Sequence, residues 1–193
     1  MDLTTGTMQD KNSRAKKMML WFAMGSIVMT FAGLTSAYVV SKSRPDWLSD
    51  FEIPGAFYRS TAFLLASSIT MFFAKRLIKA ENHSMGLISL FFTLLLGIAF
   101  VQFQFLGFSQ IIEAGYYFTG AESNVTTSFL YAITVTHIVH VIAGLIVLLV
   151  LIYNQFKNKY KNGNTLGLEL GATFWHFLDF LWVYLILFFY FFR

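Results

Sequence analysis

The chain has 193 residues, no cysteine, 56% hydrophobic residues, only 12% charged residues and a net charge of +4 at pH 7. A soluble domain usually carries about 25% charged residues, so this composition is typical of a membrane protein. The absence of cysteine excludes disulfides, iron–sulfur clusters and thiolate chemistry. It leaves His, Met and carboxylate side chains as possible metal ligands.

The first long apolar segment covers about residues 18–41. It follows a basic stretch that contains Lys11, Arg14, Lys16 and Lys17. Such a stretch is typical of a signal peptide, but the apolar part of a signal peptide has only about 7–15 residues. We therefore expect a retained transmembrane helix. Gly25, Met29 and Gly33 share one face of it, where small side chains would allow another helix to pack closely.

Four further segments are long and apolar enough to cross a bilayer, which takes about 20 residues. They cover about residues 58–78, 85–110, 125–153 and 171–192. In hydrocarbon, every backbone N–H and C=O must be paired within the chain, which favours helices over isolated strands. The sequence therefore predicts an all-α fold, a polytopic transmembrane bundle of five helices in a single domain that covers residues 1–193.

Basic residues are distributed unequally between the two sides of this predicted bundle. The N-terminal segment and the loops after the second and fourth helices hold ten Lys and Arg residues, whereas the other two loops and the C-terminus hold four. Cytoplasmic loops of membrane proteins are enriched in Lys and Arg. The distribution predicts a cytoplasmic N-terminus and a C-terminus on the opposite side. Because topology and anionic lipid account for the positive charge, we expect no nucleic-acid binding.

Ionisable residues inside the last two predicted helices form the candidate site. His137 and His140 lie three residues apart in the fourth helix and share a face. The fifth helix opens with Trp175, His176 and Asp179. A carboxylate inside a membrane helix is costly unless it is paired. We therefore expect Asp179 to face the bundle and to bond to His176 or to the fourth helix, in a polar seam between the fourth and fifth helices.

The sequence gives no strong signal for a catalytic or metal site. His137 and His140 share one face and cannot bind a single haem from both sides, and His176 differs in depth from His140 by on the order of 10 Å. No HExxH pattern or phosphate-binding loop is present. We predict no catalytic, cofactor-binding or metal-ligating residue. Two functions in which this chain would act by itself stay open. The first is a proton-coupled transporter or channel that uses the His/Asp seam, and the second is a membrane enzyme or dihaem cytochrome.

Residues 169–182 resemble the last-helix signature of haem–copper oxidase subunit III. That signature has a Glu six residues before a Trp-His-Phe-x-Asp-x-x-Trp run. Here the matching residues are Glu169, Trp175, His176, Asp179 and Trp182. The agreement in both identity and spacing of these charged and aromatic residues makes the resemblance specific.

Two further segments are similar to the same family. Residues 136–144 resemble its Phe-His-Gly-Leu-His-Val-Ile-x-Gly helix, and residues 24–38 resemble its third helix, so that the resemblance covers about residues 18–193. Seven-helix members begin with two further helices, whereas the five-helix form occurs in bacterial cytochrome c and quinol oxidases. Ile27 stands where the family often has a Glu, so the role of that carboxylate is not expected here.

The resemblance implies a non-catalytic subunit III of a respiratory oxidase, which reduces oxygen to water and translocates protons. In that family the haem and copper belong to partner subunits, and subunit III packs against subunit I and holds phospholipids. The implied setting is a bacterial inner membrane, with subunit II, small subunits and a larger supercomplex as further partners. Glu169, His176 and Asp179 are then the first candidates for interhelical bonds or lipid-headgroup contacts. His137 and His140 are the next candidates for the same role. Both cytochrome c and quinol remain open as electron donors.

Overall fold

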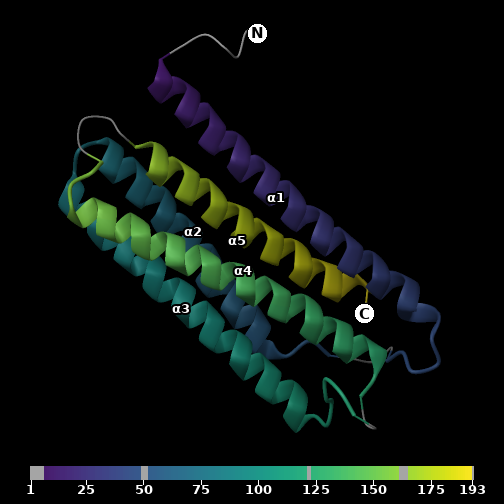
Figure 1. Cartoon of the computed structure of the whole chain (residues 1–193). Coiled ribbons are helices and arrows are strands. Elements are labelled where there is room, and N and C mark those ends of the chain that lie inside the picture. The colour runs from purple at the N-terminus through teal and green to yellow at the C-terminus, as the bar shows by residue number, and fades with distance from the viewer. Residues whose placement is uncertain (1–6, 49–51, 121–122, 161–164, 193) are drawn as a thin grey trace.

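The computed structural model of the protein describes residues 7–48, 52–120, 123–160 and 165–192 (Figure 1). Its helices are α1 (Met8–Val40), the 3-10 turn η1 (Ser41–Ser43), α2 (Gly55–Lys79), α3 (His83–Glu113), α4 (Val125–Phe156) and α5 (Leu166–Phe192). Within these residues, β pairing is limited to one isolated bridge between Tyr117 and Ser123. Five helices are long and apolar enough to cross a membrane. The prediction of an all-α bundle with five membrane-spanning helices is confirmed.

Helix α1 begins at Met8, well before the start predicted at residue 18. Thr7 and Asp10 explain the early start, because they form a capping box. The Thr7 hydroxyl accepts a hydrogen bond from the backbone N–H of Asp10 at 3.2 Å, and the Asp10 carboxylate accepts one from the backbone N–H of Thr7 at 3.1 Å. Hydropathy marks the part of a helix that lies in hydrocarbon, whereas capping residues decide where the helix begins.

The ends of α2, α3 and α4 are each followed by a residue with left-handed backbone conformation. These residues are Glu81, Gly115 and Asn158. After α3, the N–H of Gly115 bonds to the carbonyl oxygen of Ile112, and the N–H of Tyr116 bonds to that of Ile111. This pair of bonds satisfies carbonyl groups that the helix end leaves without partners. At the start of α4, Asn124 accepts a hydrogen bond from the backbone N–H of Thr127 at 2.9 Å.

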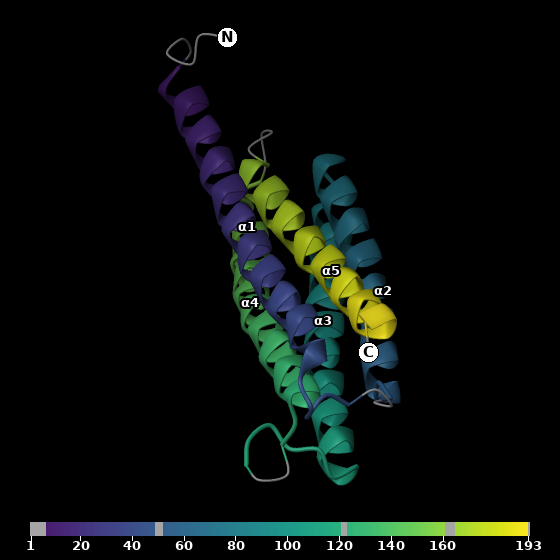
Figure 2. The same ribbon diagram turned by 90° about the vertical axis from the view of Figure 1, so that its right-hand side faces the viewer.

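Four of the helices form a compact group and α1 lies at its edge. Helix α2 packs along α3, α3 packs against α4, and α5 contacts both α2 and α4, whereas α1 packs chiefly against α4 and α5. The N-terminal part of α1 stands clear of the other helices (Figures 1 and 2). Helix α1 begins and α5 ends at opposite ends of the bundle (Figure 1), as an odd number of spans requires. The cytoplasmic location of the N-terminus stays a prediction. Lys161 and Arg193, two of the basic residues on which it rests, lie outside the described residues.

Glycine residues let α3 and α4 approach the buried Trp175 ring of α5. A Cβ atom at Gly97 would lie 2.8 Å from Cη2 of Trp175, and one at Gly144 would lie 3.2 Å from the same ring. The positions of Gly25 and Gly33 on α1 are different, because nothing lies within 4 Å of a Cβ atom built there. The close packing expected on that face of α1 is therefore not formed within the described part of this chain.

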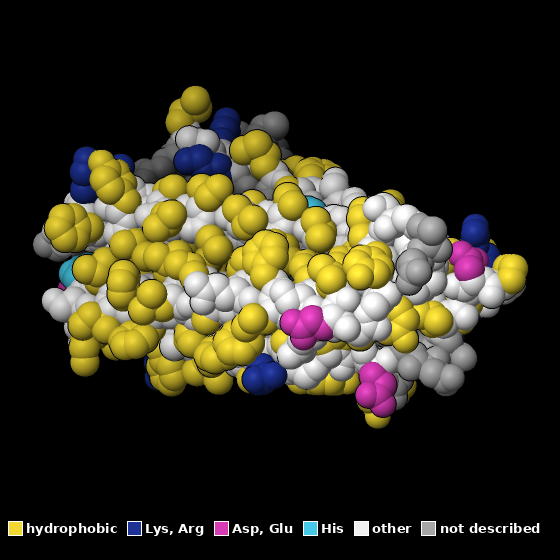
Figure 3. Space-filling view, turned by 90° about the horizontal axis from the view of Figure 1, so that it is seen from below, with side chains coloured by type: hydrophobic (Ala, Val, Ile, Leu, Met, Phe, Trp, Pro, Cys, Tyr) yellow, Lys and Arg dark blue, Asp and Glu magenta, His cyan; other side chains and the backbone are white. Residues whose placement is uncertain are grey.

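Large apolar side chains are exposed on every helix. Phe22, Phe156 and Phe180 have exposed fractions of 72%, 75% and 73%. On the face seen in Figure 3, hydrophobic side chains cover most of the visible area and charged side chains are few. Contiguous apolar surface of this kind marks contact with lipid or with partner proteins.

We predict that Gly97→Ala lowers the thermal stability of the protein in detergent, because the new methyl group would overlap the Trp175 ring. Overpacking of a buried site costs about 1–3 kcal/mol. Gly33→Ala is the matched control, since its Cβ position is open. Thermal unfolding followed by circular dichroism gives the two midpoints. Equal midpoints for the two variants would contradict the packing described for Trp175.

Candidate functional site

Trp175 and Trp182 bond α5 to α2. The indole N–H of Trp175 donates to Oγ of Ser67 at 3.1 Å, and the indole N–H of Trp182 donates to Oγ1 of Thr61 at 2.9 Å. Both rings are almost fully buried. A buried indole N–H needs an acceptor, and here each acceptor is a hydroxyl on the neighbouring helix.

His176 adds a third bond between the same two helices. Its Nδ1 lies 2.7 Å from Oγ of Ser68 and 4.0 Å from Oδ2 of Asp179. The Asp179 side chain is only 5% exposed, and neither of its oxygens has a hydrogen bond of ordinary geometry among the described residues. The Ser68 hydroxyl lies beside the Asp179 carboxyl group. We call the bonds that Trp175, His176 and Trp182 make with α2 the α2–α5 polar seam.

The predicted seam between the fourth and fifth helices is wrong, because the hydroxyl groups that meet α5 come from α2. His137 of α4 is fully buried and stacks on Trp182 with ring centroids 5.2 Å apart. Neither of its ring nitrogens has a hydrogen-bond partner in the described part of the chain. Nδ1 of His140 lies 2.7 Å from the carbonyl oxygen of Thr136 in its own helix. Helices α4 and α5 thus meet through ring packing rather than through hydrogen bonds.

Sequence reasoning missed the hydroxyl groups of α2 as partners. Thr61 and Ser67, which accept the two indole hydrogens, lie six residues apart, and Trp175 and Trp182 lie seven residues apart. Six or seven residues correspond to about two helical turns, so each pair lies along one side of its helix. The similar spacing in the two segments is the signal that could have paired them.

An ion pair joins α2 and α5 at the end where α5 begins. The carboxylate of Glu169 accepts a hydrogen bond from the ammonium group of Lys79. His176 lies seven residues beyond Glu169 and Asp179 lies ten residues beyond it. With a rise of about 1.5 Å per residue, these distances are about 10 Å and 15 Å along the helix. If the ion pair lies at the headgroups, Asp179 lies near the middle of a hydrocarbon core about 30 Å thick.

Other polar side chains in the bundle also bond between helices. Nε2 of Gln104 in α3 donates to Oγ of Ser60 in α2 at 3.0 Å, and Nε2 of Gln155 in α4 donates to the carbonyl oxygen of His83 in α3 at 3.2 Å. Among the described residues, no group of three or more His, Asp or Glu side chains could hold a metal ion. Within the part of the chain that the structure describes, these polar side chains link helices to one another.

Comparison of the sequence with known proteins identifies the family of this chain. A family model described as cytochrome c oxidase subunit III matches residues 17–193. The chain belongs to the cytochrome c oxidase subunit III family. It is 38% identical to cytochrome c oxidase subunit 3 of Drosophila yakuba over 135 residues, which cover 70% of this chain and 48% of the relative. It is 28% identical to that of Bacillus sp. (strain PS3) over 185 residues, which cover 93% and 85% of the two chains.

The length of the match differs between these relatives of the subunit III family. The chain spans about half the length of the insect relatives that it matches, at 48%, and most of the length of the bacterial one, at 85%. Ile27, which replaces the Glu expected for the family, packs against an apolar cluster that includes Phe31 and Ile138. A carboxylate at this position would therefore face apolar side chains.

We predict that Ser67→Ala destabilises the protein by about 1–3 kcal/mol, because it leaves the buried indole N–H of Trp175 without an acceptor. Ser109→Ala is the matched control, because the Ser109 hydroxyl is exposed and bonds only within its own helix. Unfolding by denaturant in detergent measures both changes. The double variant with Trp175→Phe should be less destabilised than the sum of the single variants, since both partners are then removed. Additive effects would mean that the bond contributes nothing.

Proposed function

We propose that this chain is a non-catalytic subunit of a haem–copper respiratory oxidase in a bacterial inner membrane, with its N-terminus in the cytoplasm. Family membership and the five apolar helices support this proposal. The observation that carries it is the α2–α5 polar seam, in which Trp175, His176 and Trp182 are engaged in joining α5 to α2. Haem, copper, oxygen reduction and proton translocation then belong to partner subunits.

In this proposal the chain supplies a rigid scaffold beside subunit I, together with subunit II and small subunits. Trp175 and Trp182 tie α5 to α2 by hydrogen bonds, and the glycines of α3 and α4 hold the Trp175 ring from the other side. A surface that is fixed before association loses little conformational freedom when a partner binds. The large exposed apolar side chains provide the area for contacts with partner helices and lipid.

The transporter alternative is less well supported by the polar contacts. A proton path needs hydrogen-bonding groups that follow one another through the membrane, whereas Trp175 and Trp182 each bond to a single hydroxyl of α2. His137 is enclosed by aromatic rings, and His140 bonds within its own helix. Within the described residues, these groups do not form a continuous chain of hydrogen bonds.

A groove between α1, α4 and α5 supports the proposal that this subunit holds phospholipid. Its volume of about 470 Å³ lies within the range of about 300–1,000 Å³ for small-molecule sites. Apolar side chains line most of it, with Asn154 and Tyr160 as polar exceptions. Burial raises the pKa of the Tyr160 hydroxyl, which therefore stays neutral. Lys17 lies close to Glu169 at the start of α5. An acyl chain suits the groove, and an anionic headgroup suits Lys17.

We predict that the tagged chain purified from its native membranes in mild detergent brings with it a larger chain that contains haem. The Soret band of the sample should follow that larger chain and disappear when the two are separated, because the proposal places no haem here. Absorption spectra and peptide mass spectrometry of the separated chains measure this. A chain that purifies alone, or that keeps its own Soret band, would refute the proposed function.

We predict that Ala23→Phe, which fills the groove between α1, α4 and α5, reduces the phospholipid retained by the purified complex by one molecule per complex. Ala37→Phe is the matched control, because Ala37 is also exposed on α1 but does not line the groove. Lipid extraction and mass spectrometry, normalised to haem, give the comparison. Equal lipid content in the two variants would exclude this groove as the lipid site.

A further inference from the structure

The carboxyl group of Asp179 is enclosed between two helices at membrane depth. Its side chain is only 5% exposed, and it lies ten residues, or about 15 Å along α5, from the ion pair that Glu169 forms with Lys79. Trp175 precedes it by four residues and Trp182 follows it by three, so the three side chains share one side of α5. That side meets α2, because both indole groups bond to hydroxyls of α2. The packing therefore shields this carboxyl group from water and from lipid headgroups.

Within the described residues, no Lys or Arg side chain is paired with Asp179. Neither of its oxygens has a hydrogen bond of ordinary geometry there, and the ion pairs of basic side chains lie elsewhere. The lysines at this end of the bundle gather around Glu169 instead: Lys79 binds it, and Lys75 and Lys17 lie near it. An unpaired carboxylate in an apolar medium is far more costly than a neutral carboxyl group. The position of Asp179 thus favours its neutral form.

The imidazole rings near the site do not balance a negative charge either. Nδ1 of His176 lies 4.0 Å from Oδ2 of Asp179, which is beyond hydrogen-bond distance, but only 2.7 Å from Oγ of Ser68. On α4, His137 stacks on Trp182 and makes no hydrogen bond in the described part of the chain. A charged imidazole donates a short, direct hydrogen bond to a carboxylate. The distances therefore favour two neutral groups over an imidazolium–carboxylate pair.

The hydroxyl group of Ser68 links Asp179 to His176. It lies beside the carboxyl group and 2.7 Å from the imidazole ring. A hydroxyl has a single hydrogen, so Ser68 can donate to only one of these two neighbours and can only accept from the other. A protonated carboxyl group has both an O–H donor and a C=O acceptor. It therefore suits either direction of the Ser68 hydroxyl and either tautomer of the His176 ring.

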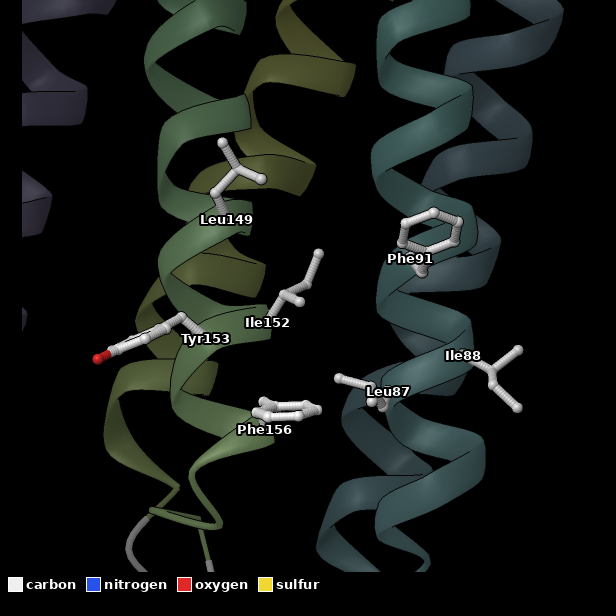
Figure 4. A pocket seen from close by; sticks show the side chains of 7 residues that line it. All are labelled: Leu87, Ile88, Phe91, Leu149, Ile152, Tyr153 and Phe156. Carbon is white, nitrogen blue, oxygen red and sulfur yellow. The ribbon is translucent and has the colours of Figure 1, made fainter.

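Ser68 and His176 are also a polar link from this carboxyl group to the surface of the bundle. The His176 side chain is 36% exposed. A groove of about 470 Å³ between α3 and α4, at the same end of the bundle, has a different character, because apolar side chains and Tyr153 line it. Figure 4 shows Phe156 and Leu87 reaching toward each other from the two helices, while the Tyr153 hydroxyl points away from α3. A proton that enters or leaves the buried carboxyl group would therefore pass through Ser68 and His176.

We propose that Asp179, Ser68 and His176 form a proton-binding site inside the bundle, with one proton held on the Asp179 carboxyl group at neutral pH. The proposal goes beyond the proposed function, because it concerns side chains of this chain alone and needs no partner subunit. Loss of the proton would place a negative charge on the side of α5 that carries Trp175 and Trp182. Such a charge should weaken the contact between α2 and α5, since nothing in the described structure compensates it.

Infrared spectroscopy of the full chain, purified in mild detergent with any chains that stay bound, tests the protonation state. A protonated carboxyl group has a C=O stretching band that is separate from the bands of carboxylates and amides. We expect such a band at pH 7, and we expect Asp179→Asn to remove it. Glu169→Gln is the matched control, because it makes the same change at an ion-paired carboxylate and should leave the band in place. Identical carboxyl bands in Asp179→Asn and the unchanged chain would mean that Asp179 is ionised, and would overturn the proposal.

The pH dependence of stability gives a second test. Stability falls as pH rises wherever the folded state binds more protons than the unfolded state. A proton held on Asp179 in the folded chain and released on unfolding raises the unfolding equilibrium constant by up to about tenfold per pH unit. The amide of Asp179→Asn carries no such proton, so this variant should lose less stability between pH 6 and pH 8. Unfolding by denaturant in detergent gives both curves, and parallel curves would refute the proposal.

Ser68→Ala keeps the proposal testable if Asp179→Asn does not fold. This variant removes the hydroxyl beside the carboxyl group, so the carboxyl C=O band should shift in frequency rather than disappear. Ser109→Ala is the matched control, because the exposed Ser109 hydroxyl bonds only within α3 and its loss should leave the band unshifted. A band at the same frequency in Ser68→Ala and Ser109→Ala would contradict the assignment of the proton to this site.

Discussion

The structure depends on one constraint, which is that a buried indole N–H inside hydrocarbon needs an acceptor within the protein. Serine and threonine hydroxyls of α2 supply the acceptors, and each of these hydroxyls also donates a hydrogen bond within α2. Oγ of Ser67 donates to the carbonyl oxygen of Leu64 at 2.7 Å and accepts the indole N–H of Trp175. The hydroxyl of Thr61 does the same with Phe57 and Trp182. Since each hydroxyl hydrogen is used within α2, its lone pairs remain for α5, and this fixes which sides of the two helices face each other.

Packing around the two tryptophans holds the remaining helices in place. Trp175 fits where Gly97 of α3 and Gly144 of α4 leave room for its ring, and Trp182 stacks on His137 of α4. Each tryptophan ring is therefore held on one side by a hydrogen bond to α2 and on the other side by close packing against neighbouring helices. A helix–helix contact in a membrane gains little from the hydrophobic effect, so close packing and interhelical hydrogen bonds decide which helices associate.

Helix α1 and the exposed side of α5 are the part of the molecule that these interactions leave open. Gly25 and Gly33 of α1 meet no neighbour in the described structure, and Phe180 of α5 is largely exposed. The chain spans about half of its insect relatives, and the proposed function gives it partner chains. The exposed surface is thus consistent with a subunit whose contacts are completed by other chains and by lipid.

The sequence by itself determined the number of helices, their approximate limits and the family. Long apolar segments can cross a bilayer in few other ways, and the spacing from Glu169 to Trp182 is specific. The sequence also placed Trp175, His176 and Asp179 at membrane depth, because helical rise alone sets depth. Only the tertiary structure decided that their partners lie on α2 rather than on α4. Periodicity tells which residues share a face of a helix, but which helix meets that face depends on hydroxyl direction and ring packing in three dimensions.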